Sequence, residues 1–295
     1  MPIDSCRKYI LSAVALILTA LFLFDGSANA AEPTDASDFE DSGFLWLVNA
    51  ENTLPPSYMP QNLTAYNRVR IHPAARDAWV LLLEAMQADG IYGLHLHSAF
   101  RDYERQEYLF NQKVRRYRSQ GHSREDAEAL AVFVVQHPGA SEHQTGLALD
   151  VSTTGQLNQS FGETRSGEWL CENAHRFGFI IRYPKTKTHI THIIYEPWHL
   201  RYVGLPHAPI LYEHDLTLEE YADFLSVHAP YLYLHESGER YLIQYTAGLP
   251  DPMPGDVIDI SGTRFADNIY FVTASRIRDP LYGSYETAGK KNCLQ

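Results

Sequence analysis

Two short stretches of the sequence combine histidine with a carboxylate in otherwise apolar surroundings. The first, SEHQTGLALDVS, contains His143 and Asp150, and the second, YEPWHLRYVG, contains Glu196 and His199. A catalytic zinc site without cysteine uses imidazole and carboxylate ligands, three in all, and needs a base near the activated water. The two stretches therefore predict a single metal centre to which both contribute.

The spacing within each stretch is compatible with a shared metal. A turn followed by a strand can bring His143 and Asp150 to one ion. Glu196 and His199 lie three positions apart, and such positions point to opposite faces of a straight strand. Pro197 predicts a bend that brings these two side chains together, one as a ligand and the other as a base. Any one of these residues alone is more typical of a turn, a core or a cap, so the prediction depends on the whole pattern.

The neighbouring segments predict the elements that position these side chains. Residues 147–152 alternate as a strand does, with Asp150 on the face opposite the leucines. Further strands are predicted for YGLHLHSAF, FIIRYP, HITHIIYE and WHLRYVG. Helices are predicted over 73–88, from Asp102 as cap to about Tyr117, over REDAEALAVFVVQ after Ser123, over SGEWLCENAHRFGF up to Gly178, and in APILYEHDLTLEEYADFLSVHA with a capping box of Thr217 and Glu220. This mixture predicts an α+β core.

The two ends of the chain differ in composition and residue pattern from its middle. The apolar run YILSAVALILTALFLF follows Arg7 and Lys8, and SANA then provides the small residues of a signal-peptidase site. We expect a signal peptide over 1–30, with an uncleaved membrane anchor as the alternative. A polar linker is expected over 31–43, the main domain over 44–229, and a small β appendage over 230–295.

Charge and cysteine content exclude several classes of protein. The 295 residues include 24 Lys and Arg against 36 Asp and Glu, a net charge of −12, which argues against a nucleic-acid or anionic-membrane partner. No CxxC spacing occurs among the three cysteines, which argues against a thiolate zinc site. We expect Cys171 to be a buried apolar residue rather than half of a disulfide, although a pairing with Cys293 stays open.

The motifs SxHxxGxAxD at 141–150 and ExxH at 196–199 resemble those of the VanY-type D-alanyl-D-alanine carboxypeptidases. These are zinc peptidases related to lysostaphin and to the Hedgehog signalling domain. SAFRDYERQEYLF is similar to the arginine-bearing segment of the family, and LVNAENTLPPSYMP to its N-terminal wrap. The resemblance spans about residues 47–225. It implies an antiparallel sheet that is flanked by helices and holds a single zinc site.

The resemblance also implies a role for each matching residue. The implied zinc ligands are His143, Asp150 and His199. Glu196 matches the base that activates water and later protonates the leaving amine. Arg101 matches the arginine that stabilises the developing oxyanion or binds the substrate. Ser141 and Gln106 match positions near the substrate carboxylate.

We therefore expect an exported, zinc-dependent D,D-carboxypeptidase that removes the terminal D-alanine from peptidoglycan stem peptides. It would be secreted, periplasmic or held in the cell envelope, without a stable membrane partner once the signal is cleaved. One alternative keeps the same chemistry but hydrolyses a different bond, as an L,D-carboxypeptidase on tetrapeptide stems or a cross-bridge endopeptidase does. A second is a non-catalytic, zinc-containing wall-binding domain, which has no need of Glu196. In a third alternative the protein binds the cell wall through its C-terminal appendage, although that segment shows no repeat or aromatic ladder.

Overall fold

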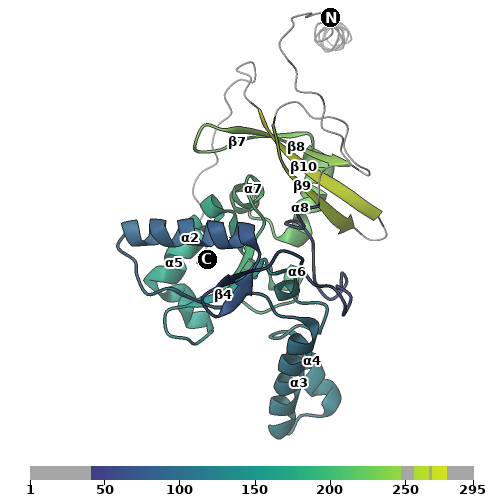
Figure 1. The fold of residues 1–295 in the computed structure, drawn as a ribbon. Coiled ribbons are helices and arrows are strands. Elements are labelled where there is room, and N and C mark those ends of the chain that lie inside the picture. The colour runs from purple at the N-terminus through teal and green to yellow at the C-terminus, as the bar shows by residue number, and fades with distance from the viewer. Residues whose placement is uncertain (1–40, 247–255, 266–267, 278–295) are drawn as a thin grey trace, which may run out of the picture. The chain divides into compact units, whose positions relative to one another are not determined.

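The computed structural model describes residues 41–246, 256–265 and 268–277 (Figure 1). The chain divides into two compact units, Met1–Asp38 and Phe39–Gln295, and every described residue belongs to the second. The expected signal peptide, most of the expected linker and Cys293 lie outside the described residues. Within the described ranges, no helix has the length and apolar character that crossing a bilayer requires.

A four-stranded antiparallel sheet with the order β3-β4-β6-β5 carries the candidate site. Its strands are β3 (His95–Ser98), β4 (Ala148–Ser152), β5 (Phe179–Ile181) and β6 (His199–Tyr202). Side chains alternate between the two faces of a strand. Leu149 and Leu200 therefore enter the main core, while Asp150 and His199, which pair across β4 and β6, share the opposite face. The predicted antiparallel sheet and the predicted side of Asp150 are confirmed.

Helices cover the apolar face of this sheet. The buried stripe of α2 (Pro73–Ala88) packs Trp79, Leu82 and Met86 into the same core as the strand leucines, as the sequence pattern predicts. Trp169 and Leu170 of α5 (Arg165–Asn173) enter this core as well. Each large apolar side chain that is fully buried contributes about 1.5–3 kcal/mol to folding. This packing makes the sheet a firm base for the side chains on its other face.

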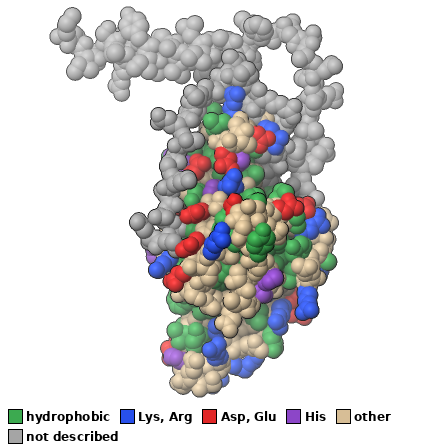
Figure 2. Space-filling model, turned by 90° about the vertical axis from the view of Figure 1, so that its left-hand side faces the viewer, with side chains coloured by type: hydrophobic (Ala, Val, Ile, Leu, Met, Phe, Trp, Pro, Cys, Tyr) green, Lys and Arg blue, Asp and Glu red, His purple; other side chains and the backbone are tan. Residues whose placement is uncertain are grey.

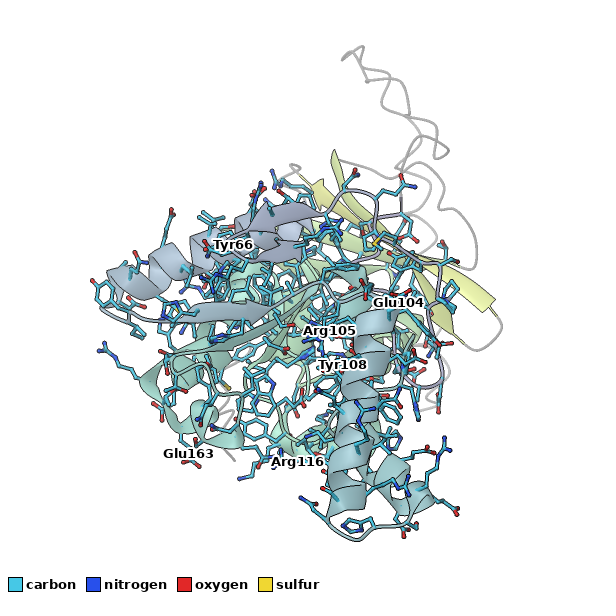
Figure 3. The ribbon with its side chains drawn as sticks, turned by 60° about the horizontal axis from the view of Figure 1, so that its bottom comes forward. Tyr66, Glu104, Arg105, Tyr108, Arg116 and Glu163 are labelled. Atoms are coloured by element: carbon cyan, nitrogen blue, oxygen red, sulfur yellow. The ribbon has the colours of Figure 1, made fainter. Side chains whose placement is uncertain are left out.

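Two helices form a separate pair beside the sheet (Figure 1). They are α3 (Tyr103–Ser119) and α4 (Arg124–Val132), and they pack through a small cluster of Phe110, Val114, Ala127 and Ala131. The predicted caps are present, because Asp102 accepts from the Arg105 amide and Ser123 from the Asp126 amide. Arg105, Tyr108 and Arg116 project from α3 in Figure 3. The helix α4 ends at Val132, earlier than predicted, because the chain then turns back on Ala131.

The segment HITHIIYE is not a strand, and this prediction was wrong. It begins in α6 (Thr188–Thr191), after the 3-10 turn η5 (Lys185–Lys187), and His192 ends the helix in a left-handed conformation. The backbone amide of Ile194 donates to the carbonyl of Phe133, and that of Glu196 donates to Tyr183. Tertiary hydrogen bonds to loops have overridden the β propensity of threonine and isoleucine.

Helical and β elements complete the C-terminal part. The predicted helical stretch divides into α7 (His207–Glu213) and α8 (Leu218–His228), and the capping box of Thr217 and Glu220 is confirmed. A second antiparallel sheet has the order β7-β8-β10-β9, with strands β7 (Tyr231–Leu234), β8 (Arg240–Thr246), β9 (Asp256–Phe265) and β10 (Asn268–Ile277). Side chains of β7 and β8 share a core with α7 and α8. The described residues thus form the predicted α+β fold, and a domain boundary near residue 230 stays a prediction.

Charged side chains and one cysteine are further features of the described residues. Acidic and basic side chains lie side by side on the face shown in Figure 2. Cys171 is only partly buried on α5 and is disulfide-bonded, so the expectation of a buried apolar residue was wrong. The other two cysteines of the chain lie outside the described residues.

Candidate metal centre

Three buried side chains meet on the polar face of the central sheet. His143, Asp150 and His199 each offer one ligand atom, and these atoms all lie within 4.8 Å of one another. His143 comes from the 3-10 turn η2 (Glu142–Thr145), Asp150 from β4 and His199 from the first position of β6. The structure therefore brings together the three residues that the family resemblance implies as zinc ligands.

The turn before β4 sets the position of His143. Gly146 adopts a φ of 75°, a left-handed conformation that glycine tolerates best, and its amide donates to the His143 carbonyl over 3.2 Å. This closes η2 and redirects the chain into β4. His143 therefore lies beside the strand that carries Asp150, with its Nε2 atom 3.2 Å from Asp150 Oδ2.

The tautomer of His143 follows from its backbone contact. Its Nδ1 atom lies 2.6 Å from the carbonyl oxygen of Ala99, which can only accept, so the proton is on Nδ1 and Nε2 carries a lone pair. Burial and the nearby charge of Arg101 lower the pKa of His143 to about 4. The ring is therefore neutral near pH 7, and a neutral ring with a second partner on Nδ1 is the usual form of a metal-binding histidine.

His199 presents its other ring nitrogen to the cluster. Its Nδ1 atom lies 3.2 Å from Asp150 Oδ1, while Nε2 lies 3.8 Å from Glu142 Oε2. Burial alone lowers the pKa of His199, but Asp150 and Glu142 outweigh it and raise the pKa to about 9. A proton on His199 therefore competes with a metal ion for Nδ1.

The donor set and its dimensions fit zinc. The buried Nε2 atom of His143 has no hydrogen-bond partner among the described residues, although it faces a carboxylate oxygen. Ligand atoms of a tetrahedral zinc site, with bonds of about 2.0–2.1 Å, lie about 3.3 Å apart. Asp150 lies close to that spacing from both histidines, through Oδ2 at 3.2 Å from His143 Nε2 and through Oδ1 at 3.2 Å from His199 Nδ1. Three ligands with two imidazoles and one carboxylate leave a fourth position for water or substrate.

Glu196 lies beside this cluster in a tight turn. The His199 amide donates to the Glu196 carbonyl over 3.0 Å, which confirms the predicted bend around Pro197. The buried carboxylate has Oε2 3.7 Å from His199 Nδ1. Burial raises the pKa of Glu196 to about 8, and His199 opposes this shift. A cation bound at the cluster would also favour the carboxylate, the form that can accept a proton.

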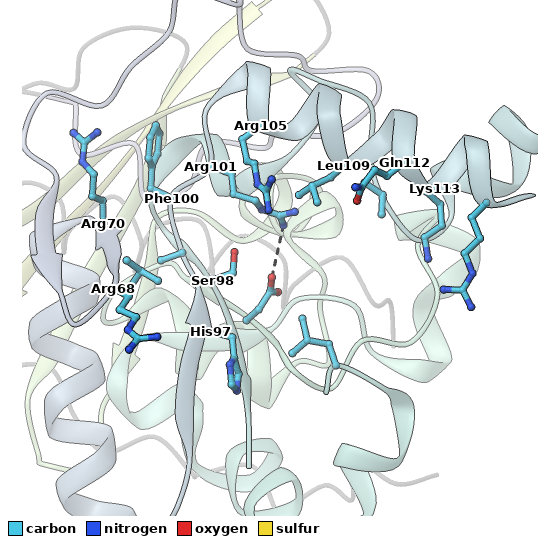
Figure 4. A pocket seen from close by; sticks show the side chains of 16 residues that line it. Arg68, Arg70, His97, Ser98, Phe100, Arg101, Arg105, Leu109, Gln112 and Lys113 are labelled. Carbon is cyan, nitrogen blue, oxygen red and sulfur yellow. Dashed lines mark ion pairs between the residues drawn. The ribbon is translucent and has the colours of Figure 1, made fainter. Parts of the chain in front are cut away.

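Arg101 follows β3 and faces the same cluster. Its amide donates to the His143 carbonyl over 3.0 Å, and its Nη2 atom lies 3.7 Å from Asp150 Oδ2, the pair that Figure 4 marks. Both residues line a cleft of about 750 Å³. Burial lowers the pKa of Arg101, but an arginine stays protonated at any physiological pH. The guanidinium is thus placed to contact a molecule in the cleft.

Ser141 and Gln106 take different positions. Ser141 is the buried residue before η2, and its hydroxyl makes no capping hydrogen bond. Gln106 is buried between α3 and the segment after α4, where its Nε2 atom donates to the Gln136 carbonyl over 2.7 Å. Gln106 is not among the residues that line the cleft. Contact of either residue with a substrate stays a prediction.

A group of buried charges that the sequence motifs did not predict lies behind His199. Glu142 Oε1 accepts from Arg182 Nε over 2.7 Å and lies 3.0 Å from Arg201 Nη1, and all three side chains are almost completely buried. Arg182 also makes two hydrogen bonds of 2.6 and 2.8 Å to Glu219 of α8. The available signal was an arginine within each of the apolar strand segments FIIRYP and WHLRYVG, because charged residues are seldom buried unless they are paired.

Known proteins are similar to the part of the chain that contains the candidate metal centre. A family model described as VanY, D-alanyl-D-alanine carboxypeptidase, matches residues 68–205. The chain is 42% identical over 190 residues to YodJ of Bacillus subtilis, a match of 60% of this chain and 66% of YodJ. It is 39% identical over 198 residues to a D-alanyl-D-alanine carboxypeptidase of Enterococcus faecalis, a match of 66% of this chain and 69% of that protein. The matches span about two thirds of the length of these relatives.

Solved structures give a similar result. One is a variant of the vancomycin-resistance D,D-pentapeptidase VanY in complex with Zn(II), at 40% identity and a TM-score of 0.54 over 60% of this chain and 97% of that chain. Another is the LD-carboxypeptidase LdcB, also at 40% identity and a TM-score of 0.54, over 61% of this chain and 86% of that one. Both similarities extend over most of the solved chain.

Proposed function

The chain belongs to the VanY D-alanyl-D-alanine carboxypeptidase family, and from this premise we propose that it is an exported zinc carboxypeptidase acting on peptidoglycan stem peptides. The proposed reaction is hydrolysis of the last amide bond, with release of the terminal D-alanine. The observation that carries the proposal is the buried cluster of His143, Asp150 and His199, with Glu196 as a separate carboxylate beside it.

The proposed roles divide between a metal and the side chains around it. His143, Asp150 and His199 would hold zinc, which when bound would supply Lewis acidity toward the scissile carbonyl and the attacking water. Glu196 accepts the proton that the attacking water loses and delivers it to the leaving nitrogen as the carbon–nitrogen bond breaks. A carboxylate that is buried, close to the cluster and not needed as a ligand suits this task.

The proposed role of Arg101 is to bind negative charge on the substrate. A guanidinium can hold a carboxylate through two parallel hydrogen bonds, so it suits either the C-terminal carboxylate or the developing oxyanion. The Ser141 hydroxyl is proposed to lie near the substrate carboxylate. For Gln106 the hydrogen bond to Gln136 favours support of the α3–α4 pair over direct contact.

The runner-up function is an L,D-carboxypeptidase that acts on tetrapeptide stems. The similarity to LdcB favours it as much as the similarity to VanY favours D,D specificity, because both have the same identity and TM-score. A non-catalytic zinc-containing domain is less consistent with Glu196, since a structural zinc site has no use for a free base. The proposal of export rests on the basic and apolar N-terminal segment of the sequence.

Product identification tests the proposed function. The purified chain would be incubated with a stem pentapeptide ending in D-Ala-D-Ala and with the corresponding tetrapeptide, and the products identified by mass spectrometry. Loss of one alanine from the pentapeptide supports the D,D activity, and loss of alanine from the tetrapeptide supports the L,D alternative. Both should stop when a chelator removes the metal and return when Zn²⁺ is added. No cleavage of either peptide would contradict the enzyme proposal.

A further inference from the structure

The cleft beside the candidate metal centre is strongly basic. Six basic side chains and one carboxylate, Asp150, line its volume of about 750 Å³; the six are Arg68, Arg70, Arg101, Arg105, Lys113 and Arg116. The whole chain has the opposite bias, with 36 acidic against 24 basic residues. The face shown in Figure 2 carries both signs side by side. The basic lining is therefore a local feature that the composition does not explain.

The basic residues come from two separate elements that face each other across the cleft. Arg68 lies in the turn between β1 (Thr64–Tyr66) and β2 (Val69–Ile71), and Arg70 lies on β2. The other wall is α3, where Arg105, Lys113 and Arg116 have the spacing of one helix face. Figure 4 shows Arg68 and Arg70 on one side, Arg105 and Lys113 on the other, and Arg101 between them. In Figure 3, Arg105 and Arg116 project from α3.

Five of the six have no acidic partner in the part of the chain that the structure describes. Among the described residues, no carboxylate lies within 4.0 Å of the charged groups of Arg68, Arg70, Arg105, Lys113 or Arg116. The contacts that these groups do make include aromatic rings: Arg70 lies over Phe100 at 5.3 Å and Arg105 over Tyr108 at 5.2 Å. Like charges three residues apart on a helix, such as Lys113 and Arg116, repel each other. Burial and then the Arg116 charge lower the pKa of Lys113, while the carboxylate of Glu196, beyond ion-pair distance, opposes this shift.

The number of unpaired charges exceeds what the end of a peptide requires. A substrate of a carboxypeptidase presents one C-terminal carboxylate, and Arg101 alone can hold it. The carboxylates of Asp150 and Glu196 lie at the candidate metal centre, where they would balance the charge of a divalent ion. Five basic side chains therefore remain for other negative groups of the bound molecule.

We propose that this cleft recognises a stem peptide through free carboxylates on the residues that precede the scissile bond, a proposal that rests on the proposed function. The preferred substrate is an acidic stem, and the same stem with its carboxylates converted to carboxamides is a poorer one. The size of the cleft suits a short peptide, since pockets for small ligands usually have about 300–1,000 Å³. A long polyanion is disfavoured, because the net charge of −12 repels it outside the cleft.

Two synthetic pentapeptides test this proposal on the full chain loaded with zinc. Both end in D-Ala-D-Ala, and they differ only in whether the preceding acidic residues carry free carboxylates or carboxamides. We expect kcat/KM to be roughly 10-fold or more higher for the acidic peptide, since electrostatic focusing in a cleft is worth about 10- to 1,000-fold. The preference should arise mainly in KM and shrink in about 1 M salt, where the screening length falls to about 3 Å.

A pair of matched variants identifies the responsible charges. Lys113→Gln with Arg116→Gln removes two charges from the cleft. Arg115→Gln with Arg118→Gln removes two from the exposed part of the same helix, away from the cleft lining. We expect the first variant to lose most of the preference for the acidic peptide and the second to keep it. Thermal melting of both checks that α3 stays folded.

The outcomes separate this proposal from the proposed function. Equal hydrolysis of the two peptides by the unmodified chain overturns the charge preference and leaves the carboxypeptidase intact. The preference is also overturned if the cleft variant loses activity equally on both peptides, or if the control variant loses the preference as well. Hydrolysis of neither peptide contradicts the proposed function itself.

Discussion

The carboxylate of Glu142 lies behind His199, with Oε2 3.8 Å from the ring Nε2 atom, while Nδ1 on the other side of the ring faces Asp150 at 3.2 Å. Glu142 is itself held by Arg182 and Arg201. A carboxylate in this place orients a metal-binding imidazole and makes it a stronger donor. The buried group of Glu142, Arg182 and Arg201 therefore contacts the candidate metal centre directly through His199.

Glu142→Gln is expected to weaken zinc binding by about 10- to 100-fold, the usual effect of losing a group that supports a ligand. It should also lower the free energy of unfolding by about 3–5 kcal/mol, because two buried arginines lose part of their partner. Zinc affinity would be measured by competition with a chelating dye, and stability by urea denaturation without metal.

Glu219→Gln provides the control for Glu142→Gln. Glu219 binds Arg182 but has no contact with His199 among the described residues, so its loss should reduce stability and leave zinc affinity unchanged. If the two variants weaken zinc binding equally, the effect is one of general stability and Glu142 does not support His199.

The stability contributed by Glu142 should depend on pH. Burial alone raises its pKa, but Arg182 and Arg201 outweigh burial and hold the pKa well below 4.5. Such a carboxyl stabilises the fold fully above its unfolded pKa of about 4.3, and this stabilisation is lost as the pH falls further. The difference in unfolding free energy between the metal-free unmodified chain and Glu142→Gln should be larger at about pH 7 than at about pH 3. A difference that stays constant over this range would contradict the lowered pKa.

Zinc binding should require all three proposed ligands. Replacement of His143, Asp150 or His199 by alanine is expected to remove most of the bound zinc in each case, because two remaining ligands hold the ion poorly. Atomic absorption on the dialysed proteins measures the zinc content. His95→Ala, at an exposed position on β3, is the control and should keep full occupancy. Full occupancy in the three ligand variants would reject the assignment.

Arg101→Lys is not expected to be a conservative change. Lysine keeps the charge but loses the planar pair of donors that a carboxylate or oxyanion needs. We expect kcat/KM on a stem peptide to fall by about 10- to 1,000-fold, the range for a weakened charge-stabilising donor. Zinc content should not change. Arg124→Lys, at an exposed ion pair with Glu128, should keep normal activity. Full activity of Arg101→Lys would mean that Arg101 does not contact the substrate.

The sequence predicted the candidate site better than it predicted the surroundings. His143, Asp150, Glu196 and His199 could be selected because their types and spacing suit a metal centre, and the alternation around Asp150 gave the correct face of β4. The pairing of Asp150 with His199 across the sheet depends on strand register, which no local pattern contains.

The wrong strand prediction and the unpredicted buried charges also depend on contacts between segments that are distant in the sequence. HITHIIYE has the composition of a strand, yet hydrogen bonds from Ile194 to Phe133 and from Glu196 to Tyr183 hold it in another conformation. The partners of Glu142 come from β6 and the segment after β5, which are distant along the chain. Contacts of this kind can be seen only when the folded chain brings the segments together.

The most direct test of the proposed zinc carboxypeptidase is to measure zinc content and hydrolysis together in Glu196→Gln. The change removes the carboxylate but nearly preserves its shape, and Glu196 is not among the proposed ligands, so the variant should fold and retain zinc. Without the base, hydrolysis of the stem pentapeptide should fall by roughly 10²- to 10⁴-fold. A folded, zinc-loaded and nearly inactive protein is the predicted result. Loss of zinc would make Glu196 a ligand, and undiminished hydrolysis would exclude it as the base.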